Sequence, residues 1–209
     1  MKTFHHGQGF QADLGVARQL IAYTLRTVRK TGLPIYQPRQ QIGSSFGERL
    51  ANAVEDVFER GHQHLIIVGN DSPGLNLRLL QQANQALHEQ AMVVGPARDG
   101  GSYLIGLSRQ SYQRTSFVQL AWETNQLYAD LLAYGNALGQ SVDHLPTLSD
   151  IDSAEDLRRI WQQLPKWHGI RIWLNAHFQP TLKPTSVFIS LQLHSQLSAL
   201  ALRGPPGLP

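Results

Sequence analysis

The sequence contains no cysteine among its 209 residues. This absence excludes disulfide bonds, thiolate nucleophiles and cysteine-based zinc sites, and it fits a reducing compartment. No apolar run reaches the roughly 18 residues that a membrane-spanning helix needs, and the N-terminus lacks the apolar core of a signal peptide. The net charge is only +3, and no dense block of lysine or arginine accompanies it. We therefore expect a cytoplasmic protein that has no membrane span and no nucleic-acid partner.

Short apolar runs alternate along the chain with segments in which apolar residues recur every three or four positions. This alternation is typical of an α/β protein with a mainly parallel sheet and helices on both faces. Strands are expected at 33–36, 65–68, 91–95, 103–107 and 141–145, and helices at 12–31, 45–60, 76–90, 123–138 and from 153 onward. After Leu164 the pattern weakens, so we expect a domain over residues 1–164 and a C-terminal extension over 165–209, in which 170–178 alternates as an edge strand does.

The stretch 65–75 reads Leu-Ile-Ile-Val-Gly-Asn-Asp-Ser-Pro-Gly-Leu and gives the sharpest local signal. Its four apolar residues suit a central strand that is buried on both faces, and the residues after Gly69 break that strand. Asp71 is therefore expected just past the carboxyl end of a strand, where open α/β sheets bind ligands. A carboxylate there can hold a magnesium ion that bridges a diphosphate, or it can simply shape the turn. This stretch alone leaves both readings open.

Two further features have both a structural and a functional reading. Asp99-Gly100-Gly101 follows a predicted strand, and glycines beside an acid allow the backbone to approach a ligand, although Asp-Gly is also an ordinary hairpin turn. Ser45 and Glu48 form a capping box at the start of the second helix. Arg49 places a cation in the first turn of that helix, where it opposes the helix dipole. Arg49 is therefore expected either to form an ion pair with an acid or to bind an anionic ligand.

Asp150 and Asp152 lie two residues apart, just before the helix that begins near Ser153. On an extended backbone two such side chains face the same side. Two carboxylates that face each other repel unless a cation or a proton lies between them. The pair is thus a candidate metal site.

Five motifs in order resemble one known family. They are Phe46-Gly47-Glu48-Arg49-Leu50, Gly69 to Leu75, Gly95-Pro96 with Asp99 to Tyr103, Trp122-Glu123-Thr124, and Asp150-Ile151-Asp152 with Asp156-Leu157. The pattern resembles the bacterial radical SAM/selenodomain-associated transferases, and it covers about residues 10–162. The resemblance implies the glycosyltransferase-A-like fold of the nucleotide-diphospho-sugar transferases.

The resemblance also implies roles for particular residues. Asp71, with Asp150 and Asp152, is expected to bind Mg²⁺ or Mn²⁺, and Asp99 is expected to act on the acceptor. The expected nucleotide- or substrate-binding residues are Lys2, Arg49, Asn70, Gly100, Gly101 and Trp122. The function implied is transfer from a nucleoside-diphosphate sugar to an acceptor that the sequence does not identify.

One departure from the family pattern concerns the N-terminus. The family opens with an apolar strand and a basic loop, whereas here Lys2-Thr3 is only a remnant of that loop, and Phe4 stands where arginine is usual. The first strand is therefore expected to be missing or truncated, which would leave an exposed sheet edge. This departure keeps two alternatives open, a nucleotidyltransferase of the guanylyltransferase type and a degenerate module that binds a nucleotide or a partner without catalysis. Fold alone does not choose among them.

Overall fold

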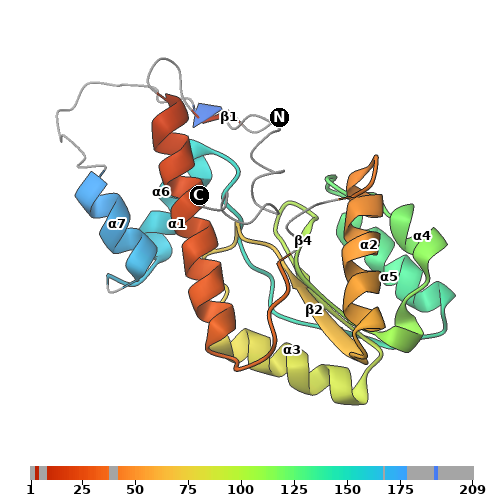
Figure 1. Ribbon diagram of the computed structural model, residues 1–209. Coiled ribbons are helices and arrows are strands. Elements are labelled where there is room, and N and C mark those ends of the chain that lie inside the picture. The colour runs from red at the N-terminus through yellow and green to blue at the C-terminus, as the bar shows by residue number, and fades with distance from the viewer. Residues whose placement is uncertain (1–2, 5–8, 38–41, 167, 178–190, 193–209) are drawn as a thin grey trace, which may run out of the picture.

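The computed structural model describes residues 3–4, 9–37, 42–166, 168–177 and 191–192. Its strands are β1 (Thr3–Phe4), β2 (His64–Val68), β3 (Met92–Pro96), β4 (Ser102–Ser108), β5 (Val142–His144) and β6 (Leu191–Gln192). Its α-helices are α1 (Gly9–Arg29), α2 (Phe46–Glu59), α3 (Leu77–Glu89), α4 (Arg114–Val118), α5 (Leu127–Ala137), α6 (Ala154–Gln163) and α7 (Gly169–His177). Figure 1 shows the sheet with helices packed around it.

The central element is a four-stranded sheet with the strand order β2-β4-β3-β5. β4 is antiparallel to both of its neighbours, whereas β3 and β5 are parallel. It follows that β2, β3 and β5 run in one direction and that β4 runs against them. The mixed α/β fold expected from the sequence is thereby confirmed. One detail was wrong: β2 lies at the edge of the described sheet and not at its centre, because the hairpin strand β4 lies between β2 and β3.

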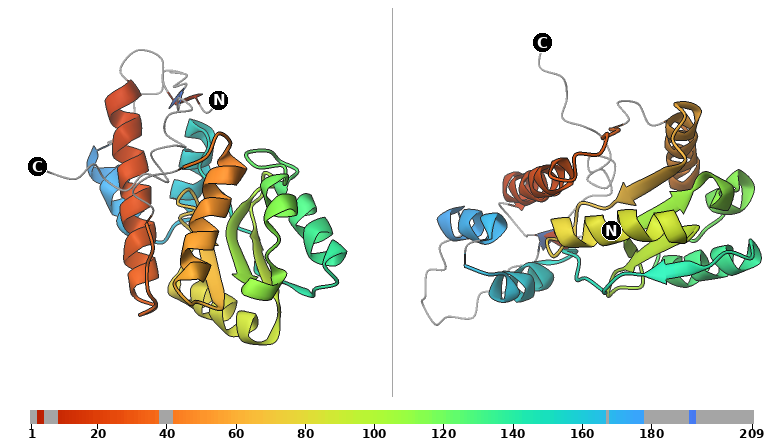
Figure 2. Two further views of the ribbon diagram at one scale, coloured as in Figure 1. Left: turned by 45° about the vertical axis from the view of Figure 1, so that its right-hand side comes forward. Right: turned by 90° about the horizontal axis from the view of Figure 1, so that it is seen from below.

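Apolar side chains of the sheet point alternately to two cores. Leu65 and Ile67 of β2 pack into a cluster with α2 and α5, whereas Ile66 and Val68 pack into a second cluster with α3. A third cluster joins α1, α6 and α7 through side chains such as Leu20, which places residues on both sides of position 164 in one core. Both views in Figure 2 show α1, α6 and α7 on one side of the molecule and α2, α4 and α5 on the other.

The outer edge of β2 pairs with no other strand of the described residues. Gly69 donates its N–H to Tyr103, and Arg109 donates to the carbonyl of Gln63, so the odd-numbered residues of β2 face β4. Hydrogen-bonded and non-bonded pairs alternate in antiparallel sheets, and the backbone groups of the even-numbered residues therefore point away from β4. This edge of β2 is therefore open in the part of the chain that the structure describes. Of the N-terminal remnant, Lys2 lies outside the described residues, and β1 pairs with β6 in a separate two-stranded sheet.

Three expected elements differ from the structure. Residues 33–36 form no strand, because they lie exposed with no strand beside them. Residues 170–177 belong to helix α7 and not to an edge strand, because Ile170 and Leu174 are four positions apart and both pack into the third core. The helix expected at 123–138 begins at Leu127, after a turn in which Glu123 has a φ of 61°.

Helix α2 begins with the capping box that the sequence predicted. The Ser45 hydroxyl accepts from the N–H of Glu48 at 3.1 Å, and the Glu48 carboxylate accepts from the N–H of Ser45. Replacing Ser45 with alanine is expected to lower the free energy of unfolding by about 1 kcal/mol. Urea denaturation measures this change. Ser116→Ala, which removes a hydroxyl of α4 that donates to the exposed side chain of Gln113, is the control, and equal stability of the two variants would contradict the capping role.

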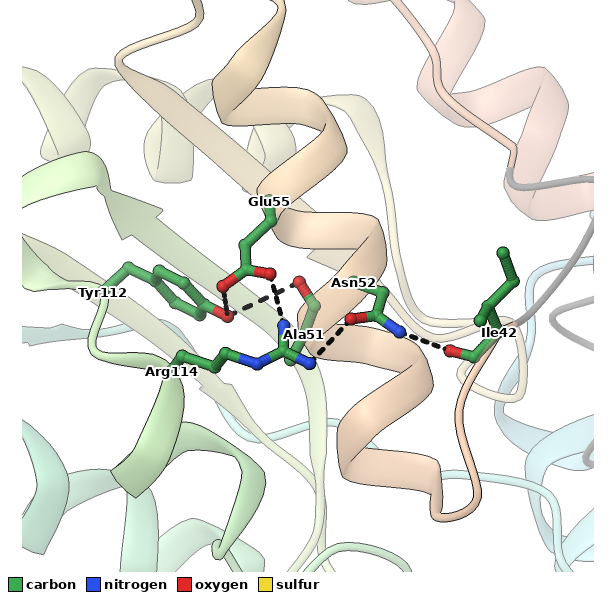
Figure 3. A network of polar contacts seen from close by, with 6 residues as sticks. All are labelled: Ile42, Ala51, Asn52, Glu55, Tyr112 and Arg114. Atoms are coloured by element: carbon green, nitrogen blue, oxygen red, sulfur yellow. Dashed lines mark hydrogen bonds and ion pairs between the residues drawn. The ribbon is translucent and has the colours of Figure 1, made fainter.

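A polar network ties α2 to the segment that follows β4 (Figure 3). Arg114 pairs with Glu55, and its guanidinium also donates to the side-chain oxygen of Asn52 at 2.7 Å. The amide of Asn52 in turn donates to the carbonyl of Ile42 at 2.6 Å. Burial, with the nearby Glu55 carboxylate as the next cause, raises the pKa of Tyr112, which therefore stays a neutral hydroxyl in this network. The network fixes the start of α2 and the segment before it.

No helix in the described part of the chain is both long enough and apolar enough to cross a membrane.

Candidate functional site

The carboxylates that the sequence singled out lie on three loops at one end of the sheet. Asp71 follows β2, Asp99 lies in the hairpin between β3 and β4, and Asp150 and Asp152 lie between β5 and α6. Carboxylate oxygens of Asp99, Asp150 and Asp152 lie within 4.8 Å of one another. The spacing argument for Asp150 and Asp152 therefore holds in the structure. The carboxylate of Asp71 is outside this group of three, but its charge acts on Asp150.

Backbone hydrogen bonds hold the three loops together. Leu148 donates its N–H to Pro96 at 3.0 Å and accepts from the N–H of Arg98 at 3.0 Å, which extends the sheet beyond β3. Three residues further on, Ile151 donates its N–H to the carbonyl of Asp71 at 2.9 Å. The position of each acid is thus set by main-chain contacts between loops that are far apart in the sequence.

The Asp99 loop is a hairpin, as one reading of Asp-Gly predicted. Asp99 accepts from the N–H of Gly101 at 2.8 Å, and its side chain is exposed. Gly100 has a φ of 91°, and a β-carbon at this position would lie 2.0 Å from the carbonyl oxygen of Asn125. The hairpin and ligand readings are compatible, because the turn itself brings Asp99 to the other acids. The Gly100 carbonyl also accepts from the N–H of Tyr128 at 2.9 Å.

Replacing Gly100 with alanine is expected to destabilise the protein by roughly 2–4 kcal/mol, because the strain of a positive φ adds to a collision with a backbone oxygen. Gly139→Ala is a matched control, since Gly139 also has a positive φ but no atom within 4 Å of an added β-carbon. The control is expected to cost about 1 kcal/mol. Thermal and urea unfolding of both variants measure the difference, and equal losses would show that Asn125 yields to the added methyl group.

Asp150 has the most perturbed charge in the site. Burial and then the neighbouring carboxylates of Asp152, Asp99 and Asp71 raise its pKa to about 7. A carboxyl group in such surroundings holds a proton or a cation more readily than one in water. The raised pKa therefore has two physical causes, which are first the burial of the Asp150 carboxyl group and then the convergence of the other acids on it.

The acid cluster has the chemistry of a site for a hard divalent cation. Mg²⁺ and Ca²⁺ prefer oxygen ligands at about 2.0–2.6 Å, so two oxygens on opposite sides of one ion lie about 4–5 Å apart. The separations within the cluster, all at most 4.8 Å, do not exceed this range. Asp99, Asp150 and Asp152 would thus suit such an ion, with Asp71 beside them.

An apolar groove of about 750 Å³ runs along the open edge of β2, between α1, α2 and α3. Arg49 and Asn70, both expected to bind nucleotide, line this groove. Five large hydrophobic side chains are exposed in the described part of the chain, and four of them line the groove: Leu33, Ile35, Tyr36 and Ile42. The groove thus gathers most of the large hydrophobic side chains that are exposed in the described part of the chain.

Trp122 and Arg49, both expected to bind the nucleotide or the substrate, lie against Phe46 at the start of α2. Trp122 donates its indole N–H to the carbonyl of Phe117 at 2.9 Å, and its ring lies against Phe46 and Phe117. The guanidinium of Arg49 lies 5.9 Å from the centre of the Phe46 ring, and no ion pair joins it to another described residue. Trp122 therefore has a packing role, and Arg49 lines the groove. That either residue contacts a ligand stays a prediction.

The fold is that of the nucleotide-diphospho-sugar transferases. A crystal structure of a "putative nucleotide-diphospho-sugar transferase" from Desulfovibrio desulfuricans G20 superposes with a TM-score of 0.68 and 22% sequence identity, over 77% of this chain and 81% of that chain. The chain belongs to the family described as "Uncharacterized protein conserved in bacteria (DUF2064)", which matches residues 14–124. No curated protein matches the chain. Asp71 and, within the acid cluster, Asp99 lie inside the region that the family covers.

Proposed function

We propose that this protein is a metal-dependent transferase that uses a nucleoside-diphosphate sugar as its donor. The observation that carries the proposal is the convergence of Asp99, Asp150 and Asp152 beside Asp71. Open α/β sheets bind ligands beyond the carboxyl ends of their strands, which is where these acids lie. The likeness to the Desulfovibrio protein supports the same class.

We assign the cation to Asp71, Asp150 and Asp152. When bound, a divalent cation neutralises the charge that develops on a departing diphosphate. These three residues would bind and orient the cation. The hydrogen bond from the N–H of Ile151 to the carbonyl of Asp71 fixes their backbone, because Ile151 lies between Asp150 and Asp152 in the sequence. The open groove beside Arg49 and Asn70 is the space that we assign to the nucleoside part of the donor.

Asp99 is the group that we assign to the acceptor, because its carboxylate is exposed at the rim of the cluster. In the transfer, the acceptor hydroxyl oxygen forms a bond to the anomeric carbon while the bond from that carbon to the diphosphate oxygen breaks. The nucleoside diphosphate leaves with the electron pair, and the hydroxyl proton passes to Asp99. Such proton transfer typically contributes ~10²–10⁴-fold to the rate.

A thermal-shift screen tests the proposal. Nucleoside diphosphates, triphosphates and diphospho-sugars are each added with and without Mg²⁺ or Mn²⁺. A metal-dependent shift with diphospho-sugars is the expected result. A shift with triphosphates alone would favour nucleotidyl transfer, and no shift with any nucleotide would favour a module without catalysis. The association with radical SAM or selenodomain proteins stays a prediction that this screen does not address.

A further inference from the structure

Carbonyl groups of the turn that carries Asp71 are held by contacts from several parts of the chain. Asp71 accepts from Ile151 at 2.9 Å, and Ser72 accepts from the N–H of Leu75 at 3.0 Å. Gly74 accepts from the side-chain amide of Asn76 at 3.2 Å. Ser72, Pro73 and Leu75 are buried, so this turn is part of the interior and is not a surface loop.

Two aromatic side chains from the α1, α6 and α7 group contact the same turn. Tyr23 of α1 donates its hydroxyl to the carbonyl of Leu75 at 2.8 Å. The imidazole of His168, just before α7, makes a polar contact with the backbone of Pro73. The two rings lie against each other, with centroids 4.6 Å apart. Tyr23 and His168 therefore contact each other and the backbone of the turn, at Leu75 and at Pro73.

Burial keeps this aromatic pair neutral. His168 is only 6% exposed, and burial lowers its pKa, an effect that its contact with Pro73 opposes. Burial likewise raises the pKa of Tyr23, opposed by Thr27 and Arg26. A neutral hydroxyl and a neutral imidazole suit contact with backbone carbonyls. The aromatic pair thus supports the backbone behind the carboxylates of the site.

We propose that Tyr23 and His168 are positioning residues, which hold the Asp71 turn in the geometry that binds the divalent cation. This inference rests on the proposed function and gives the helices α1 and α7 a part in it. Residues that orient metal ligands from behind typically change metal affinity by ~10–100-fold when they are replaced. Neither residue carries a sequence signal for this role, since the pair forms only when α1 and α7 pack together.

The test variant is Tyr23→Phe, which keeps the ring against His168 and removes only the hydroxyl. The matched control is Tyr134→Phe, because Tyr134 of α5 donates its hydroxyl to the carbonyl of Ser111, in the turn after β4, at the same distance, 2.8 Å. This hydroxyl also accepts from the N–H of Gln113. Mn²⁺ affinity is measured at a temperature at which all variants are folded. Hydrogen exchange of the Leu75 and Ile151 amides is measured without metal, and it reports on the turn independently of any cation.

We expect Tyr23→Phe to weaken Mn²⁺ binding about tenfold and to speed exchange at Leu75 and Ile151, whereas Tyr134→Phe changes neither. His168→Leu is expected to weaken Mn²⁺ binding as well, and His168→Gln, which restores an N–H donor, to recover part of the loss. Equal Mn²⁺ affinity in wild type and Tyr23→Phe would overturn the positioning role alone. A wild-type protein that binds no Mn²⁺ would overturn the proposed function, and the positioning role with it.

Discussion

Replacing Asp150 with asparagine is expected to stabilise the metal-free protein at pH 8 and to abolish its response to Mn²⁺. Asp150 has a pKa of about 7 in the folded state, against about 3.9 for an aspartate in an unfolded chain. At pH values between these two pKa values, the folded state holds one more proton than the unfolded state. The free energy of unfolding then falls as pH rises, by about 1.36 kcal/mol per pH unit.

The size of this loss of stability follows from the difference between the folded and the unfolded pKa of Asp150. A shift of about three units corresponds to an upper limit of about 4 kcal/mol, and solvent screening of a partly exposed carboxylate reduces it to roughly 2 kcal/mol. The stability of wild type should therefore decline from pH 4 to pH 7, whereas that of Asp150→Asn should not. At pH 8 the variant should melt about 4–8 °C higher in chelator.

Urea denaturation at pH 5 and pH 8 separates the variant from its control. Asp143→Asn removes an exposed carboxylate from β5, outside the cluster, and we expect it to follow wild type. Lower stability of Asp150→Asn than of wild type at pH 8 would show that the charged carboxylate is favourable in the fold. That result would remove the electrostatic reason for a cation at this position.

Replacing Asp71 with asparagine is expected to abolish metal-dependent nucleotide binding. The side chain keeps its size but loses its charge, so it no longer helps to hold a cation beside Asp150. A nucleotide at about 100 times its dissociation constant should stabilise wild type by about 2.7 kcal/mol, a melting shift of roughly 5–11 °C. The variant should show no shift in the same conditions.

The control for Asp71→Asn is again Asp143→Asn, which makes the same change of charge away from the site. Hydrogen exchange at Ile151, whose N–H bonds to the Asp71 carbonyl, shows whether the turn itself is preserved in the variant. If Asp71→Asn has an intact turn and shows the same nucleotide-induced melting shift as wild type, then Asp71 does not hold the cation. The metal assignment would then move to the group of Asp99, Asp150 and Asp152.

Much of the fold was predictable because its local signals agree with its packing. The run 65–68 forms β2, the Ser45 capping box starts α2, and Asn76 caps α3. Where the sequence failed, long-range contacts decided the outcome. Four apolar residues in a row predicted a strand in the centre of the sheet, yet β4 pairs on one side of β2 and the other edge stays open. At 170–177 the alternating and helical patterns overlap, and contact with α1 and α6 selects the helix.

The candidate site was partly readable for a similar reason. Asp150 and Asp152 share a side because they are two residues apart on an extended segment, and the structure brings Asp99 to them. The convergence itself depends on Leu148 pairing next to Pro96 and on Ile151 bonding to Asp71. No local pattern encodes those contacts, and the same holds for the meeting of Tyr23 with His168.

Electron paramagnetic resonance of Mn²⁺ with the wild-type protein is the first measurement to make on a metal-dependent transferase, because it counts bound ions without assuming a sugar or an acceptor. We expect the protein to remove the signal of free Mn²⁺ with a stoichiometry of one ion per chain, and we expect a nucleoside diphosphate to tighten this binding. An unchanged signal of free Mn²⁺ at high protein concentration, with and without nucleotide, would contradict a metal-dependent transferase at these carboxylates.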